Sequence, residues 1–475
     1  MAIRRNTIIV IGKAHNVIKT KEGIKMGLKG HLVWDKRERQ EIEEFSNEYK
    51  KFIEFAKTER LAIAYFEDLL KKSGFIKVEE FTGVEDQVYL ANRSKSLIAV
   101  KGNIENGINF VVAHVDSPRL DLKPYPFYEE SEIALVKTHY YGGLKKYQWF
   151  SLPLALVGIV VKENGEKIDV CIGCSDKDPV FVLPDLLPHL DKEDNKVSEH
   201  FKADKMNVVL GSIPLQGEEN EAVKKNVLKL IKDKYGIDEE DFVSADLELV
   251  PALKPRDVGI DSSFIGAYGH DDRICAYEGV MALLNAQTSE NQKAVGVILF
   301  DREEIGSEGD SGAQARFYKA FLRKMLRIEG IPDTESMLDE IIAKSTVLSA
   351  DVTTIQDPSY PEVHDKINAA KAGYGVGLVK YTGRGGKGGA SEAHAELVAR
   401  VRGILNKNGI SWQPSLLGKV DVGGGGTVAK FLAQEGFDTI DMGPGLLGMH
   451  SPFELVSKAD LYETYLAFKV LLEKL

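Results

Sequence analysis

The sequence predicts an α/β protein in which a β-rich segment interrupts a sheet flanked by helices. Short apolar runs of strand length, such as 294–300 and 345–350, end abruptly in charged residues, as buried strands of an α/β sheet do. Residues 119–262 instead carry aromatics, turns and short alternating runs. We therefore expect a mixed-sheet α/β/α domain built from residues 1–118 and 263–475, with a second, β-rich domain inserted at 119–262.

The composition argues against several classes of protein. The chain has 475 residues, 43% of them hydrophobic, so it can bury a large core and form more than one domain. The net charge of −11 and the lack of a long basic block argue against a nucleic-acid partner. No apolar run approaches a transmembrane span, and residues 1–10 lack the apolar core and cleavage site of a signal peptide. We expect a cytoplasmic protein that binds neither nucleic acid nor membrane.

The cysteines give a further indication of the compartment. Three cysteines are too few for a secreted disulfide scaffold, and the number is odd. Cys171 and Cys174 form a C-x-x-C pattern, but no second such pair or nearby histidine pair completes a zinc site. We interpret them as thiols of a strand or turn in a reducing compartment.

Apolar spacing predicts the order of the elements. Amphipathic periodicity predicts helices at 40–73, 221–235, 274–285, 314–328, 391–406 and 458–474. Strands are expected at 86–101 (two, through a polar turn), 108–113, 154–161, 167–172, 294–300, 345–350, 375–381 and 437–441. The glycine-rich stretch 383–389 lacks the context of a dinucleotide site. The glycines at 423–426 would let backbone approach a ligand closely.

Candidate functional residues follow the predicted strands, where α/β sheets bind ligands. The sequence places His114, Glu303, Glu304, Asp351 and His450 after four apolar strands, and Asp271 at a strand-to-helix turn. Adjacent side chains diverge, so one of the two glutamates could hold a metal while its neighbour holds a water beside it. Each residue could instead be a lone polar group at a strand end, or the cap of a helix in the case of Asp271. Five such coincidences are improbable, so we favour a metal site.

The set of residue types indicates which metals could bind. Two histidines and three carboxylates form the mixed nitrogen and oxygen set that zinc prefers and that cobalt and manganese tolerate. One bridging carboxylate, with a histidine and an acid for each metal, would make a two-metal site. Asp116 lies two residues after His114, on the same side of an extended chain, where it could fix the tautomer of a metal-bound imidazole.

These motifs resemble those of the aspartyl aminopeptidase and vacuolar aminopeptidase I family of di-metal peptidases. The resembling stretches are 113–118 (AHVDSP), 183–190 (LPDLLPHL), 271–273 (DDR), 301–307 (DREEIGS), 349–351 (SAD) and 449–452 (MHSP). The resemblance implies an α/β/α metallopeptidase domain of the phosphorylase/hydrolase-like kind. It also implies that the insertion serves as a dimerisation or lid domain.

The resemblance also implies roles for the candidate ligands. His114 and Asp351 would bind one metal, and Glu304 and His450 the other. Asp271 would bridge the two.

The same resemblance implies the catalytic pair. Glu303 would be the general base and then the general acid, and Asp116 would orient His114.

Substrate contacts and assembly are implied by the same resemblance. The residues implied to contact substrate are His189, Lys380, Gly425, Gly426 and Thr427. His189 would do so in a neighbouring subunit, since the family forms tetrahedral dodecamers from dimers. The loop after Asp351 has Asp357 where acid-specific relatives carry a histidine, which leaves an acidic and a neutral preference both open.

The sequence therefore predicts a metal-dependent aminopeptidase that removes acidic or neutral residues from peptides with a free N-terminus. It would hold two divalent metals per subunit, zinc in the first place, and associate with itself. Two other interpretations stay open. One is a di-zinc deacylase or carboxypeptidase-type hydrolase, and the other is a non-catalytic, shell-forming assembly protein.

Overall fold

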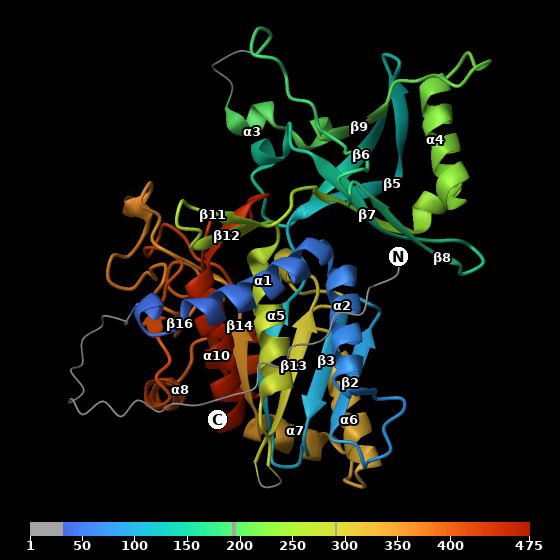
Figure 1. The fold of residues 1–475 in the computed structure, drawn as a ribbon. Coiled ribbons are helices and arrows are strands. Elements are labelled where there is room, and N and C mark those ends of the chain that lie inside the picture. Colours follow the sequence, from blue (N-terminus) through green and yellow to red (C-terminus); the bar gives the residue numbers. More distant parts are fainter. Residues whose placement is uncertain (1–31, 192–195, 290–291) are drawn as a thin grey trace.

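The computed structural model describes residues 32–191, 196–289 and 292–475. Within these ranges an α/β body lies at one end of the molecule and a β-rich unit at the other (Figure 1). Residues 1–10, on which the signal-peptide prediction rests, lie outside the described part of the chain. None of the described helices is long and apolar enough to cross a membrane.

The body is built on one large sheet. Its strands among the described residues are β1 (Ile76–Lys77), β2 (Gln87–Asn92), β3 (Ser96–Lys101), β4 (Ile108–His114), β13 (Ala294–Phe300), β14 (Thr346–Ala350), β16 (Val376–Val379), β17 (Trp412–Pro414) and β18 (Asp438–Gly443). Their order is β1-β2-β3-β13-β4-β14-β18-β16-β17. The central strands β13, β4, β14 and β18 run parallel, whereas β3 and β16 pair with them antiparallel. The predicted mixed-sheet α/β fold is confirmed.

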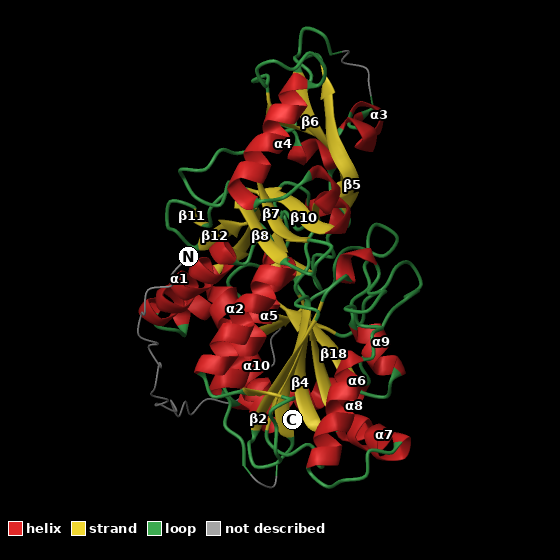
Figure 2. Ribbon diagram, turned by 90° about the vertical axis from the view of Figure 1, so that its right-hand side faces the viewer, coloured by secondary structure: helices red, strands yellow, loops and turns green. Residues whose placement is uncertain are grey.

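Helices cover both faces of this sheet (Figure 2). One apolar cluster joins the sheet to α1 (Arg39–Phe55), α2 (Glu59–Lys72), α5 (His270–Asn285), α8 (Ala395–Lys407) and α10 (Lys458–Lys474). A second joins it to α6 (Phe317–Ile328), α7 (Glu335–Lys344) and α9 (Ala429–Gln434). Every residue of β4, β13 and β14 is buried, as expected of strands covered on both sides.

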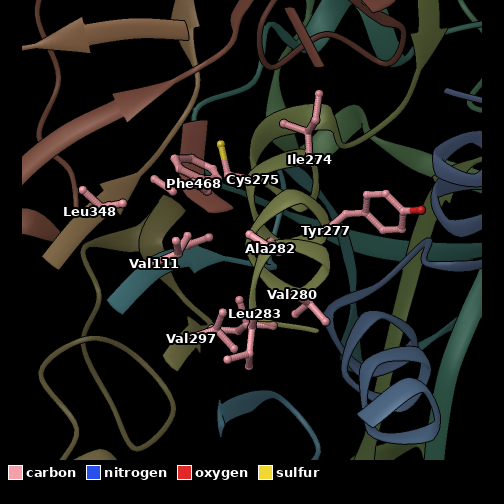
Figure 3. Packing of buried hydrophobic residues seen from close by; sticks show 14 of the residues in the cluster. Val111, Ile274, Cys275, Tyr277, Val280, Ala282, Leu283, Val297, Leu348 and Phe468 are labelled. Atoms are coloured by element: carbon pink, nitrogen blue, oxygen red, sulfur yellow. The ribbon is translucent and has the colours of Figure 1, made fainter. Parts of the chain in front are cut away.

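Helix α5 is the central element of the first cluster (Figure 3). Its buried side chains, Ile274, Val280 and Leu283 among them, lie in one cluster with Val111 of β4 and Phe468 of α10. A Cβ added at Gly279 would lie 2.7 Å from a methyl carbon of Val111, so helix and strand pack too closely there for a side chain. This close packing fixes the amino end of α5, which carries the Asp271 side chain, over the carboxyl ends of the strands.

The helix predicted at 40–73 is two helices, so that prediction was wrong in the middle. The backbone leaves the helical conformation at Ala56. Thr58 then begins α2 as its N-cap, its hydroxyl accepting the Leu61 N–H at 3.3 Å. The Lys57 ammonium donates to the carbonyls of Pro251 and Leu253, at 3.3 and 3.2 Å, which ties the break to the β-rich unit. The apolar periodicity continues across the break, so spacing alone did not reveal it.

The β-rich unit has its own sheet and its own core. Its strands are β5 (Arg119–Glu130), β6 (Ile133–Tyr141), β7 (Leu154–Val161), β8 (Lys167–Ile172), β9 (Asn207–Gly211) and β10 (Ala245–Pro251), and its helices α3 (Val197–His200) and α4 (Ala222–Tyr235). The strand order among the described residues is β8-β7-β10-β5-β6-β9, with every pairing antiparallel. All these elements fall within 119–262, the range predicted for the insertion.

Cys171 and Cys174 are joined in a disulfide, with their Cα atoms 5.9 Å apart. The prediction of free thiols was therefore wrong. The turn after β8 brings the two Cα atoms within the usual range for a disulfide. Only Cys275 is free, and it is buried in the core. The reducing compartment inferred from these thiols loses that support.

A third, small sheet joins segments that surround the strand ends. Its strands among the described residues are β11 (Arg256–Val258), β12 (Phe264–Ala267), β15 (Thr353–Thr354), β19 (Gly445–Leu447) and β20 (Glu454–Ser457), in the order β11-β12-β20-β19-β15. The remaining short 3-10 turns are η1 (Val33–Asp35), η2 (Lys146–Trp149), η3 (Ala203–Lys205), η4 (Glu239–Ser244), η5 (Glu303–Ile305) and η6 (Pro361–Val363). Because β12 precedes Asp271, β15 follows Asp351 and β20 follows His450, this sheet holds together three chain segments that carry candidate ligands.

Candidate metal centre

The candidate ligands meet where the central parallel strands end. His114 is the last residue of β4 and pairs in register with Phe300, the last residue of β13. The chain then turns through η5, which presents Glu303 and Glu304, and Asp351 directly follows β14. The sequence predicted this convergence because the carboxyl ends of parallel strands share one edge of a sheet.

One group of potential ligand atoms belongs to His114, Asp271 and Asp351. Their ligand atoms all lie within 4.8 Å of one another. The His114 Nε2 lies 3.2 Å from Oδ1 of Asp271 and 4.0 Å from Oδ1 of Asp351. Two of the three residues are buried, so the group faces little bulk water.

A second group belongs to Asp271, Glu304 and His450. The His450 Nε2 lies 3.2 Å from Oδ2 of Asp271 and 3.4 Å from Oε1 of Glu304. The two oxygens of Asp271 therefore face different groups, Oδ1 toward His114 and Oδ2 toward His450. This is the arrangement that a bridging carboxylate needs.

Each imidazole has its other nitrogen occupied. The His114 Nδ1 lies 3.1 Å from the Asp116 carbonyl oxygen and 3.2 Å from its Oδ1, so Nδ1–H donates to Asp116. The His450 Nδ1–H donates to the Gly143 carbonyl at 2.8 Å. Both rings are thereby held with Nε2 directed at the carboxylates, which is how metal-bound histidines are usually oriented.

Asp116 also fixes the turn that carries the two glutamates. Its Oδ1 accepts the Glu303 N–H at 3.1 Å and its Oδ2 accepts the Glu304 N–H at 3.2 Å. One buried carboxylate thus orients an imidazole and both adjacent acids. The structure places Asp116 where the sequence predicted an orienting residue for His114.

The clustered carboxylates of the centre favour the binding of positive charge. Burial, together with the neighbouring carboxylates, raises the pKa of Glu303 to about 7 and holds those of Glu304 and Asp351 well above their usual range. Burial opposes a charge on His450, but the carboxylates of Asp271 and Glu304 outweigh it and raise its pKa to about 10. A proton on the imidazole thus supplies a charge that a bound cation could supply instead.

The donor set fits a divalent metal ion. Oε1 of Glu304 is buried and accepts no hydrogen bond, although it lies among other polar atoms. Such an orphaned carboxylate oxygen is costly unless a cation binds it. Imidazole nitrogens and carboxylate oxygens in a partly buried site are ligands that zinc accepts, as are cobalt and manganese.

A cavity of about 510 Å³ opens beside these residues. Its lining includes His114, Asp271, Glu303, Glu304, Asp351, His450 and both glycine-rich stretches, with Gly425, Gly426 and Thr427 among them. The Gly383 N–H donates to the Gly425 carbonyl at 2.8 Å, so the two stretches form one wall. Lys380 and His189 are exposed and are not among the lining residues, so their predicted substrate contacts stay predictions.

The second aspartate of the pair and the histidine before it support the site without facing it. Oδ2 of Asp272 accepts the His114 N–H at 3.3 Å, and the peptide bond between Asp271 and Asp272 is cis. His270 donates through Nε2–H to the Ile265 carbonyl and accepts the Tyr49 hydroxyl at Nδ1, at 3.2 and 2.7 Å. Burial lowers its pKa to about 4. Both its nitrogens are used, which excludes it as a ligand in this arrangement.

Sequence reasoning missed Glu454, a buried residue of β20. Its Oε2 accepts the Asp271 N–H at 3.1 Å, and its Oε1 accepts the His450 N–H at 2.7 Å. One carboxylate therefore holds the backbone of Asp271, the candidate ligand shared by both groups, and the backbone of His450. His450 has a φ of 65°, an uncommon conformation for a non-glycine residue, and the Glu454 carboxylate accepts its backbone N–H there. The sequence predicted no strand at 454–457, and no motif marked Glu454.

Histidines and carboxylates that converge at the carboxyl ends of an α/β sheet, beside a cavity, are typical of one class of protein, the metal-dependent hydrolases. The profile of the family described as aminopeptidase I zinc metalloprotease (M18) matches residues 52–471. The chain belongs to this family, which confirms the resemblance read from the motifs.

Close relatives extend over nearly the whole chain. The probable M18 family aminopeptidase 1 of Thermotoga maritima is 55% identical over 447 residues, which cover 93% of this chain and 98% of the relative. A crystal structure of an M18 aminopeptidase from the same organism superposes with a TM-score of 0.92 at 54% identity, covering 94% and 100% of the two chains. The structure of a Saccharomyces cerevisiae mApe1 dodecamer, at 22% identity, shares the fold with a TM-score of 0.72, covering 90% and 96%.

These findings confirm the predicted enzyme class, a metallopeptidase of the aminopeptidase type. The deacylase or carboxypeptidase interpretation and the non-catalytic interpretation are not favoured, because family and relatives alike are aminopeptidases.

Replacing Glu454 by glutamine should weaken divalent-metal binding while leaving the fold intact. An amide retains only one acceptor oxygen, so one of the two backbone N–H groups loses its partner, at about 1–3 kcal/mol. We expect zinc affinity to fall about 10–100-fold, the range for residues that orient ligands. Titration with a zinc-binding dye measures this, and Glu79→Gln, at an exposed position, is the control. Equal zinc affinity in the two variants would contradict this role.

Proposed function

We propose that this aminopeptidase works with two zinc ions, held in two groups that share one carboxylate. His114, Asp271 and Asp351 would hold one ion, and Asp271, Glu304 and His450 the other. The single observation that carries this proposal is the placement of the two Asp271 oxygens, each 3.2 Å from a different imidazole nitrogen. The family description, which names zinc, supports the choice of metal. Cobalt or manganese would suit the same donors.

Glu303 is the general base in this proposal. When bound, the cations would polarise the scissile carbonyl and lower the pKa of a water beside it. Glu303 lines the cavity, belongs to neither ligand group, and keeps a free carboxylate next to them. It takes the proton of the attacking water and then delivers it to the leaving amine. Asp116 assists by holding both His114 and the backbone of Glu303 in place.

The cavity lining favours an acidic first residue. Lys387, Lys419 and Lys430 all line the cavity beyond the ligand cluster. Lys387 is paired with Glu392 at 3.0 Å, whereas the other two amines have no salt-bridge partner in the described part of the chain. We propose that these lysines attract the side-chain carboxylate of an N-terminal aspartate or glutamate, since opposite charges facing a cleft raise the local concentration of substrate.

Self-association through the β-rich insertion completes the proposal. Leu186, Leu187 and Leu190 are exposed on either side of His189, and apolar side chains grouped in this way are typical of a protein interface. We propose that a second copy covers this segment and that His189 reaches a neighbouring active site, as the family resemblance implies. Because the yeast neighbour is a dodecamer, we propose the same assembly for this chain. A cytoplasmic location also stays a proposal, made from composition.

Replacing Glu303 by glutamine should abolish most turnover and leave the metal in place. The amide keeps the shape of the side chain but cannot accept a proton, so kcat should fall by about 10²–10⁴-fold. Metal content measured by mass spectrometry and steady-state assays on the same preparation check both parts. A variant with substantial activity would remove Glu303 from the role of base.

Replacing His450 by alanine should instead remove metal. The loss of one of three donors in the second group should lower the zinc content from about two to about one ion per chain. Chelation followed by titration with zinc measures this stoichiometry. An unchanged zinc content would remove His450 from the set of ligands.

Removing the two unpaired lysines should reduce the preference for acidic residues. In Lys419→Ala/Lys430→Ala we expect kcat/KM for glutamyl and aspartyl anilides to fall about tenfold, a loss of about 1.4 kcal/mol, with little change for leucyl anilide. Lys407→Ala is the matched control, because this lysine is exposed and does not line the cavity. An equal loss on acidic and neutral substrates would exclude charge recognition by these lysines.

A further inference from the structure

We propose that the segment Tyr141-Gly142-Gly143, at the end of β6, positions residues of both candidate metal groups. The β-rich insertion would then be part of the catalytic apparatus as well as an appendage for assembly. This inference rests on the proposed two-metal function. It is carried by three separate contacts between this segment and the centre, none of which the sequence motifs indicate.

The first contact is a hydrogen bond from Tyr141 to Asp116. The tyrosine hydroxyl donates to Oδ2 of Asp116 at 2.8 Å. Asp116 is fully buried and otherwise receives the His114 imidazole and the backbone N–H groups of Glu303 and Glu304, at 3.1–3.2 Å. The hydroxyl is thus the closest donor to the carboxylate that orients one imidazole and the proposed base. Hydrogen bonds to an ionised acceptor are among the stronger ones in proteins.

Arg119 holds the tyrosine ring in place for this bond. Arg119 and Tyr141 are register partners on β5 and β6, and the guanidinium carbon lies 3.8 Å from the ring centroid. The arginine is itself fixed by Asp121 at 2.8 Å and by Glu248 at 3.2 Å. A buried cation over the aromatic face restrains the ring, so the hydroxyl has a defined direction.

The second and third contacts come from the glycines. The Gly143 carbonyl accepts Nδ1–H of His450 at 2.8 Å, and a Cβ at this position would lie 3.2 Å from that nitrogen. A Cβ at Gly142, whose φ is +73°, would lie 3.2 Å from the Glu304 Cβ. A side chain at either position would press on its neighbour more tightly than an ordinary van der Waals contact, whereas glycine fits without displacing it. The segment therefore touches both distinctive residues of the second group and, through Asp116, acts on the first.

Contacts of this kind have a known consequence in metal sites. A partner that accepts from the second imidazole nitrogen sets the tautomer and the ring orientation, and its loss typically costs 10–100-fold in metal affinity or activity. Gly143 accepts directly from the His450 imidazole, and Tyr141 acts on the His114 imidazole indirectly, through Asp116. Both are supplied by the insertion, whereas the five candidate ligands come from the body.

The test compares Tyr141→Phe and Gly143→Ala with Tyr140→Phe. Tyr140 is the neighbouring residue on β6, and its exposed fraction is 39%, so it controls for loss of a hydroxyl on this strand. Each variant is measured for zinc content, zinc affinity by competition with a chelating dye, kcat, KM and melting temperature. Phenylalanine at 141 keeps the ring beneath Arg119 and removes only the donor, so we expect an unchanged melting temperature.

For Tyr141→Phe we expect kcat or the affinity of the first zinc to fall about 10–100-fold with KM unchanged. For Gly143→Ala we expect a selective loss of the second zinc, because the methyl group displaces His450. If Gly143→Ala does not fold, Tyr141→Phe alone decides. Values for Tyr141→Phe equal to those of Tyr140→Phe would overturn the inference. Wild-type protein that binds fewer than two zinc ions would instead overturn the proposed function, so the two failures are distinguishable.

Discussion

Repulsion among clustered carboxylates is the constraint that the rest of this structure has to satisfy. Five carboxylates share one end of the sheet, where little water can screen their charges. They belong to Asp116, Asp271, Glu303, Glu304 and Asp351. Such a cluster is unfavourable unless cations enter it or protons neutralise it. The raised pKa values of Glu303 and His450 both express that requirement. The fold tolerates this cluster because its apolar core stabilises the strands that carry it.

The structure holds the cluster together mainly through carboxylates that accept backbone N–H groups. Asp116 receives two N–H groups of the glutamate turn, and Glu454 receives those of Asp271 and His450. In each case one buried acid joins chain segments that are far apart in sequence. Ligand geometry therefore depends on these buried carboxylates behind the ligands, which explains how His114 and Asp351, more than 200 positions apart in the sequence, come within 4.0 Å of each other.

Features that depend on local rules were predictable from the sequence, whereas features that depend on long-range contacts were not. The apolar runs located the central strands, and their polar ends located the residues that cluster, because strand ends in a parallel sheet converge. Glu454, Tyr141 and Gly143 escaped notice, since each acts through a contact with a distant segment. The helix break at 56–58 and the disulfide of the C-x-x-C turn depend on backbone geometry that apolar spacing does not encode. The motif residues His189 and Lys380 do not line the cavity, although Lys380 lies between Val379 and Tyr381, which do, so their predicted substrate contacts stay predictions.

The position of the insertion is a consequence of the same geometry. Strand β5 begins at Arg119, three residues after Asp116, and β6 returns antiparallel, with Tyr141 opposite Arg119. A hairpin that leaves the site and comes back must return its last residues to the point of departure. Tyr141 therefore reaches Asp116 because of the topology, whatever the remainder of the insertion does. The hairpin can vary in length or pairing at its far end without disturbing the centre, whereas its base is as constrained as the ligands themselves.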